Sequence, residues 1–163
     1  MKTYRTLKRG FTLVEILIVV IILGILAAIV IPQFTNASTD ARKNSLTSQL
    51  QTVRSQIELY KLQHNDQLPD FTGKQWGQMT AQTDVNGSTT ATTKDFGPYL
   101  QQTPSNPLNG DTGITTVAAD PVVATDTVAT GGNGFVVNTV NGKVWATNQT
   151  DTAYFDESTG LLK

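Results

Sequence analysis

An uninterrupted apolar run near the N-terminus constrains this chain more than any other feature. Residues 16–31 read ILIVVIILGILAAIVI, fifteen apolar residues and one glycine, and no charged residue occurs between Glu15 and Asp40. The segment from Phe11 to Phe34 holds a single ionisable group, and as a helix it would reach about 36 Å, which is enough to cross a bilayer. The chain must therefore place this segment in a membrane or in the interior of an assembly.

Charge is distributed unevenly along the chain. Residues 1–10 carry four bases and no acid, so the overall net charge of −1 leaves residues 11–163 with 8 bases against 13 acids, or −5. An acidic remainder without a basic patch argues against nucleic-acid binding. The chain has no cysteine, which excludes disulfides, thiol catalysis and thiolate zinc sites.

A basic start followed by an apolar stretch is also typical of a signal peptide. This stretch is longer than the usual apolar region of roughly 7–15 residues, and Glu15 lies just inside it. A carboxylate at the centre of a membrane helix costs about 2.5–3.5 kcal/mol, and less near the interface, so Glu15 requires a partner. Cleavage between Gly10 and Phe11 would supply one, because the new α-amino group would lie one helical turn from Glu15 of the same subunit or near that of a neighbour.

The segment KRGFTLVE, residues 8–15, resembles the processing site of the type IV pilin and pseudopilin superfamily. The resemblance implies that prepilin peptidase cuts after Gly10, that Phe11 becomes the N-methylated first residue, and that Glu15 directs methylation and subunit docking. Two alternatives remain open. They are a soluble protein released from a signal peptide and a single-span anchor with an incidental glutamate.

These features divide the chain into four parts. Residues 1–10 are a cleaved basic leader, 11–34 a transmembrane or filament-core helix, 35–64 an amphipathic helix, and 65–163 an extracytoplasmic head. The leader's bases outnumber Arg42 and Lys43 beyond the apolar segment, which predicts an N-terminus in the cytoplasm and a head outside it. The chain is therefore expected to be a single-pass protein of the bacterial inner membrane with a periplasmic head.

One helix is predicted from about Thr12 to about Gln63. The resemblance places Gly24 and Pro32 at helix-loosening positions, and a kink or local unwinding is expected there because proline removes a hydrogen bond to residue i−4. His64, the only histidine, is expected in solvent at the helix end. Beyond Pro32, apolar residues step by 4, 3, 4 and 3 and form one stripe: Leu46, Leu50, Val53, Ile57 and Tyr60.

The rest of the chain predicts a small head and a fold of the α+β class, with an antiparallel sheet packed on the helix as in pilins. Residues 72–95 are rich in threonine and predict a surface loop instead of a core element. Two β-prone runs joined by Asn141-Gly142 predict a hairpin over residues 135–147 with a type I′ turn. Residues 153–155 and 114–118 are further strand candidates. The expected core residues are Phe135, Val137, Trp145 and Phe155.

Two observations concern the branch of the superfamily that the chain resembles. Residues 96–100 (FGPYL) and 104–110 (PSNPLNG) are similar to a segment of the major pseudopilins of type II secretion. Those proteins typically bind calcium in a C-terminal loop, but the acids here are scattered and lack EF-hand spacing, so no metal site is assigned. The acids that could contribute oxygen ligands are Asp111, Asp120, Asp126, Asp151 and Asp156.

No motif for nucleotide binding or hydrolytic catalysis is evident in the sequence. The resemblance therefore implies a structural subunit and not an enzyme, with no cofactor. Copies of the chain would form a helical filament, with prepilin peptidase, minor pseudopilins and an inner-membrane assembly platform as partners, and a separate motor would supply the energy. The expected function is that of a major pseudopilin driving type II secretion. The alternative is a type IV pilus pilin used for adhesion, motility or DNA uptake.

Overall fold

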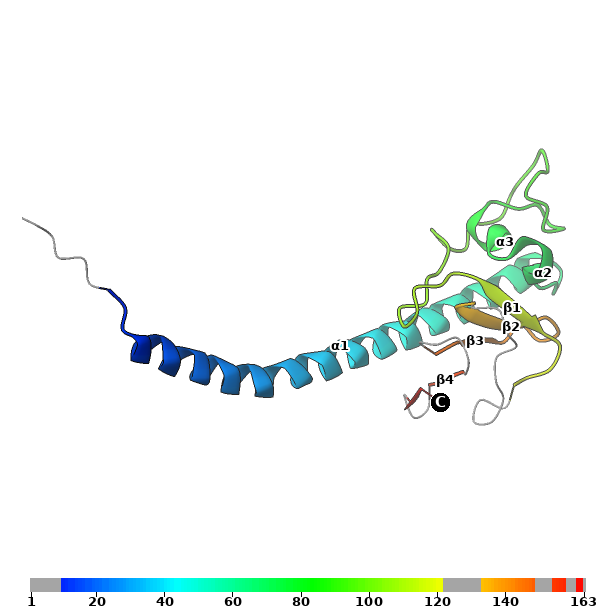
Figure 1. Ribbon diagram of the computed structural model, residues 1–163. Coiled ribbons are helices and arrows are strands. Elements are labelled where there is room, and N and C mark those ends of the chain that lie inside the picture. The colour runs from blue at the N-terminus through cyan, green and yellow to red at the C-terminus, as the bar shows by residue number, and fades with distance from the viewer. Residues whose placement is uncertain (1–9, 122–132, 149–153, 158–160, 163) are drawn as a thin grey trace, which may run out of the picture. The chain divides into compact units, whose positions relative to one another are not determined.

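A computed structural model describes residues 10–121, 133–148, 154–157 and 161–162 (Figure 1). The chain divides into two compact units, Met1–Asp40 and Ala41–Lys163. Helix α1, Leu13–Gln63, begins in the first unit and ends in the second. The predicted extent of this helix is confirmed.

Helix α1 continues without interruption through Gly24 and Pro32. Of the two outcomes expected there, a kink or local unwinding, the unwinding does not occur in the isolated chain. Proline removes one hydrogen bond, but the bonds on either side remain, and extending a helix past one missing bond avoids the cost of a new nucleus. A loosening role for Gly24 and Pro32 within an assembly stays a prediction.

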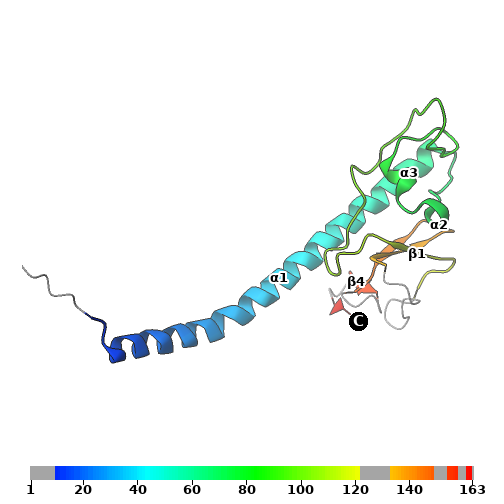
Figure 2. The same cartoon turned by 45° about the horizontal axis from the view of Figure 1, so that its top comes forward.

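The second unit is built on the apolar stripe of α1. All five stripe residues are at most 2% exposed, which confirms the amphipathic pattern. They pack against the short helix α2, Phe71–Lys74, against Met79 of α3, Gly77–Thr80, and against the inner side of a sheet. Figures 1 and 2 show these elements along the C-terminal part of α1.

The sheet contains three strands in the order β1, Ile114–Val117, β2, Phe135–Asn138, and β3, Val144–Ala146. Strands β2 and β3 are antiparallel, with Phe135 opposite Ala146. Strands β4, Phe155–Asp156, and β5, Leu161–Leu162, form a second antiparallel pair. The α+β class and the mostly antiparallel sheet are confirmed. Strands β1 and β2 are parallel, however, with Ile114 opposite Phe135. The sequence between them, residues 118–134, exceeds the dozen or so residues that a parallel connection requires.

The hairpin between β2 and β3 is confirmed, but the predicted type I′ turn is wrong. The amide of Asn138 donates to the carbonyl of Lys143 at 2.9 Å, so the loop between these two residues contains four residues, 139–142. Gly142 has φ +76°, whereas Asn141 does not have the positive φ that a type I′ turn requires. The side chain of Asn138 accepts from the amides of Val140 at 2.7 Å and Asn141 at 3.3 Å, and so closes the loop from inside.

Three of the four predicted core residues, Phe135, Val137 and Phe155, are buried at 2% exposure or less. Trp145 is half-buried and packs beside Val136 and Tyr154 on the other side of the sheet. Successive side chains of a strand point to opposite faces, and Val144 and Ala146 occupy the inner one. The prediction for Trp145 was therefore wrong by one position in the alternation.

The surface loop predicted for residues 72–95 is also partly wrong, because this segment contributes to the core. Trp76 is 3% exposed and Met79 is fully buried. The indole Nε1 of Trp76 donates to the carbonyl of Thr112 at 2.7 Å, and its ring meets Phe71 and Phe135 edge to face. A few large side chains among many threonines are enough to bury the segment.

Candidate functional site

The N-terminus of α1 is organised by a reciprocal pair of side chains, Thr12 and Glu15. The amide and the hydroxyl of Thr12 both donate to Glu15 Oε2 at 2.9 Å, and the amide of Glu15 donates to Thr12 Oγ1 at 3.2 Å. This is a capping box, in which two otherwise unpaired helix-terminal amides are satisfied by side chains. The spacing Thr-x-x-Glu is visible in the sequence and was missed there.

The structure places the predicted processing residues together with this cap. Gly10, Phe11, Thr12 and Glu15 line one open hollow of about 460 Å³. Phe11 is 83% exposed, and within the described residues nothing donates to Glu15 Oε1. One carboxylate oxygen is thus held by the helix's own cap, and the other is open beside the residue that cleavage would make the first.

The surface that follows the cap is almost entirely apolar. From Leu13 to Ile31, every large apolar side chain is between 41% and 81% exposed within the chain. By length and composition α1 is able to cross a membrane. A surface of this size is not stable in water and has to be covered by lipid or by protein.

The sequence predicted that His64 lies in solvent, and this prediction is wrong. The residue lies in the core of the second unit and is 1% exposed. Its ring stacks on Tyr60 at 3.7 Å between centroids and also contacts Phe96 and Tyr99. Nδ1 lies 2.8 Å from the carbonyl of Tyr60, and Nε2 lies 2.9 Å from Thr83 Oγ1. The histidine is a structural residue that ties the end of α1 to residues 83–99.

The segment PSNPLNG forms a second polar centre. Asn106 is fully buried, and its Nδ2 donates to the carbonyls of Gly134 at 2.9 Å and Thr147 at 3.0 Å. Its Oδ1 accepts from the amide of Leu108 at 2.9 Å. Asn109 adds a bond from Nδ2 to Thr147 Oγ1 at 2.9 Å. Residues 104–110 therefore hold the start of β2 and the end of β3 together. The side chains of Asn106 and Asn109 make the hydrogen bonds that do so.

Arg54 joins α1 to the C-terminal part of the chain. Its Nη1 and Nη2 donate to the two carboxylate oxygens of Glu157 at 2.9 and 2.5 Å, and its Nε donates to the carbonyl of Val144 at 3.1 Å. A bidentate pair of this kind is stronger and more directional than a single contact. Among the described contacts, Arg54 is the charged residue of α1 that binds both strand β3, at Val144, and Glu157, the residue that follows β4.

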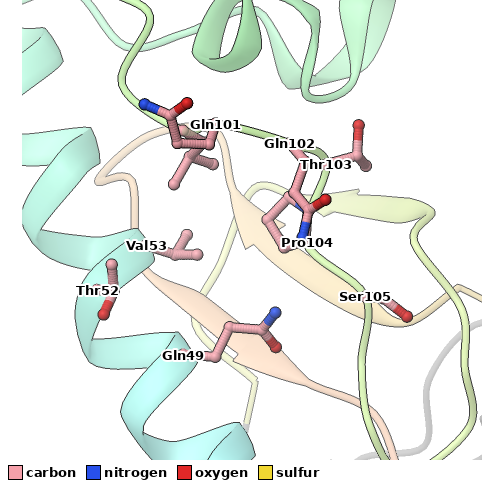
Figure 3. Close-up of a pocket in the computed structure, with 9 residues that line it drawn as sticks. Gln49, Thr52, Val53, Gln101, Gln102, Thr103, Pro104 and Ser105 are labelled. Carbon is pink, nitrogen blue, oxygen red and sulfur yellow. The ribbon is translucent and has the colours of Figure 1, made fainter.

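One groove of about 380 Å³ lies between α1 and residues 100–105 (Figure 3). Its lining side chains are uncharged, among them Gln49, Thr52 and Val53 of α1. The Oε1 atom of Gln49 is buried and has no hydrogen-bond partner among the described residues. None of these lining side chains is an acid, or a base that could activate a nucleophile, so the groove lacks the groups that acid–base or nucleophilic catalysis requires.

The acids considered for calcium are not brought together. Within the described ranges no group of three or more His, Asp or Glu side chains could hold a metal ion. Asp120 instead accepts from Asn138 at 2.6 Å and Asn141 at 2.7 Å, and pairs with Lys143. These donors, Lys143 first, hold the pKa of Asp120 below its usual range. Asp126 and Asp151 lie outside the described residues, and Asp111 and Asp156 belong to no such group.

Similarity to known proteins agrees with these N-terminal features. The sequence pattern described as the prokaryotic N-terminal methylation motif matches residues 5–31. Type II secretion system core protein G of Klebsiella pneumoniae is 31% identical over 104 residues, which is 64% of this chain and 71% of that protein. The protein of the same name from Dickeya chrysanthemi is 40% identical over 58 residues, 36% of this chain and 38% of that protein. Type IV major fimbrial protein FimA of Dichelobacter nodosus is 34% identical over 93 residues, 57% of this chain and 60% of that protein.

The chain belongs to the family of pilins and pseudopilins that carry the N-terminal methylation motif. Proteins of this family are structural and not enzymes, and they are associated with membranes and filaments. The match to the Dickeya chrysanthemi protein is 58 residues long, so this chain spans about two fifths (38%) of the length of that relative. No solved structure matches the chain.

Proposed function

We propose that the mature chain, residues 11–163, is the repeating subunit of an inner-membrane-anchored pseudopilus that drives protein export by type II secretion. The observation that carries this proposal is the N-terminal site. There an exposed apolar surface begins at Glu15, whose Oε1 accepts from none of the described residues, directly beside the expected cleavage point. Identity of 31% over 71% of a type II secretion core protein G supports the same branch of the family.

The proposal assigns processing and docking to the residues of this site. Prepilin peptidase cuts between Gly10 and Phe11, and the released amine of Phe11 is then N-methylated. In the filament, Glu15 accepts the amine of a neighbouring subunit, so that two charges within an apolar environment neutralise each other. Glu15 therefore specifies the axial register, whereas burial of apolar surface provides most of the stability.

The membrane holds the subunit before assembly. The apolar part of α1 spans the inner membrane, the basic leader keeps the N-terminus in the cytoplasm, and the acidic head lies outside it. Assembly exchanges lipid for neighbouring helices around the same surface. The partners are further copies of the chain, the peptidase, minor pseudopilins and an inner-membrane platform, with energy from a separate motor.

The second candidate function is that of a pilin in a type IV pilus, used for adhesion, motility or DNA uptake. Similarity to the fimbrial protein of Dichelobacter nodosus, which extends over 93 residues and 60% of that protein, favours it. Deletion of the gene separates the two. Loss of protein export with surface pili intact supports the pseudopilus, whereas loss of surface pili with export intact supports the pilus.

Processing and assembly are tested by two substitutions in full-length chains expressed in bacteria. Gly10→Ala is expected to abolish cleavage, measured by N-terminal sequencing, with Gly24→Ala as the control that is still processed. Glu15→Leu is expected to enter the membrane and fail to form filaments in electron micrographs. Glu15→Gln retains an acceptor for Thr12 without the charge, and separates the cap from docking. Wild-type processing of Gly10→Ala, or normal filaments from Glu15→Leu, would contradict the proposal.

A further inference from the structure

Strand β1 forms one edge of the three-stranded sheet, because β2 is its one neighbour among the described strands. The carbonyls of Gly113 and Val117 accept amide protons from the segment that contains β2, at 3.0 and 2.9 Å. The odd-numbered residues of this stretch therefore bond toward β2, and the backbone groups of the even-numbered residues face away from it. An edge of this kind offers amides and carbonyls to any extended segment that reaches it.

Two side chains that follow α2 occupy most of this edge. Gln75 Oε1 accepts from the amide of Ile114 at 2.7 Å, and Gln75 Nε2 donates to the carbonyl of the same residue at 3.3 Å. The indole Nε1 of Trp76 donates to the carbonyl of Thr112 at 2.7 Å. We call Gln75 and Trp76 the edge cover. Figures 1 and 2 both show α2, which directly precedes these residues, beside β1.

The carboxamide of Gln75 takes the place of the peptide group of an added strand. It offers one acceptor and one donor to the two backbone groups of Ile114, as a residue of a neighbouring antiparallel strand would. Because the side chain ends there, it satisfies the edge without extending the sheet. Gln75 has φ +51°, in the left-handed region that favours glycine. Glycine would suit this backbone better, but it could make neither of the two bonds to Ile114.

The opposite edge of the sheet, at β3, is occupied in a similar way. The carbonyl of Lys143 accepts from β2, so the carbonyl of the next residue, Val144, faces outward, and it accepts from Arg54 Nε at 3.1 Å. Side chains from helical segments thus bind both edges. On β1 one outward-facing residue remains, Thr116, and no described group bonds to its backbone amide or carbonyl. The edge cover therefore leaves a single residue of β1 open to pairing.

We propose that the edge cover prevents strand addition at β1 by the same edge of a second copy of this chain. Two identical edges can pair about a twofold axis, which makes a second copy the partner most often within reach. The cover is a property of the monomer, whereas its use rests on the proposed filament function. Heads that are concentrated in a membrane or a filament meet one another constantly, and pairing between their sheets would compete with ordered assembly.

Amide hydrogen exchange in the detergent-solubilised full chain measures the cover directly. In the wild type, the amide of Ile114 is expected to exchange about tenfold more slowly than that of Thr116, because only the first has an acceptor among the described residues. Gln75→Gly suits the backbone and removes the cover, so exchange at Ile114 in the monomer should become about tenfold faster. Gln102→Gly, at an exposed position beside α1, is the matched control and should change neither rate.

Self-association, followed by sedimentation in the same detergent, supplies the second measurement. Gln75→Gly is expected to associate at concentrations about tenfold below those at which the wild type does. Adding Thr116→Pro should restore the wild-type behaviour, because proline cannot donate to an added strand, whereas association caused by unfolding would not be reversed. Gln75→Lys also removes the acceptor for the Ile114 amide but leaves a charge at the edge, so it should exchange fast at Ile114 and stay monomeric.

The outcomes discriminate between the inference and the function on which its use rests. Unchanged exchange at Ile114 in Gln75→Gly, or association that Thr116→Pro does not reverse, would overturn the edge cover and leave the filament function in place. Regular filaments in normal number from Gln75→Gly would overturn the role of the cover in assembly. Absence of filaments from the wild-type chain would overturn the proposed function, whereas the exchange and sedimentation results on the monomer would still decide the cover.

Discussion

Replacement of Asn106 by alanine tests whether the buried connector holds the head together. The side chain is fully buried and makes three hydrogen bonds, to the carbonyls of Gly134 and Thr147 and from the amide of Leu108. At about 1 kcal/mol for each bond, and with polar groups left unpaired in the core, the expected loss is roughly 3–4 kcal/mol. For a domain of this size that lowers Tm by roughly 10 °C or more.

The assay is urea unfolding of full-length protein in detergent, followed by tryptophan fluorescence, to which buried Trp76 contributes. Asn106→Asp keeps the acceptor for Leu108 but turns a carboxylate toward two carbonyls, so it should be no more stable than the alanine variant. Asn86→Ala, at an exposed position, is the matched control and should change stability by less than about 0.5 kcal/mol. A loss below about 1 kcal/mol for Asn106→Ala would refute the reasoning.

Two further predictions concern pH. Burial, with smaller contributions from Tyr99, Asp84 and Asp70, raises the pKa of Tyr60 to about 12, so the folded state holds its proton more tightly than the unfolded chain. Stability should therefore fall as the pH rises from about 10 to 12, by at most about 3 kcal/mol, and Tyr60→Phe should flatten this slope in urea unfolding; an unchanged slope would contradict the assignment. The lowered pKa of Asp120 has the opposite sign, because its stabilising effect is present above the unfolded value and is lost as the pH falls through the folded one. The stability difference between wild type and Asp120→Asn should accordingly shrink below about pH 4, whereas a difference constant with pH would argue against the Lys143 pairing.

The extent of α1 and its buried stripe were predictable from sequence because both depend on local spacing. Residues three or four apart on a helix share a face whatever the rest of the chain does, and Leu46, Leu50 and Ile57 are buried accordingly. The residues of the predicted processing site could be singled out for a similar reason, since Gly10, Phe11 and Glu15 are neighbours along the chain. The cap between Thr12 and Glu15 is equally local and could have been read from their spacing.

The environment of His64 was not predictable because its partners are distant in sequence. Thr83, Phe96 and Tyr99 follow it by 19 to 35 residues, within a segment whose threonines suggested a surface loop. Trp145 illustrates a different limit. The alternation of a strand separates two faces, but it does not say which of them meets the helix, and the small residue Ala146 took the inner position. The parallel pairing of β1 with β2 was likewise not predictable, because the two strands are separated by a long segment and local patterns do not specify their relative direction.

The histidine that sequence placed in solvent provides a spectroscopic reporter for the head. It is the only imidazole in the chain, so any signal from such a ring has a single assignment. A backbone carbonyl can only accept, which fixes the proton of the neutral ring on Nδ1 facing Tyr60 and leaves Nε2 to accept from the Thr83 hydroxyl. Nitrogen NMR of the selectively labelled ring would thus show whether the head keeps one and the same packing in detergent, in membranes and in filaments, without the introduction of any probe.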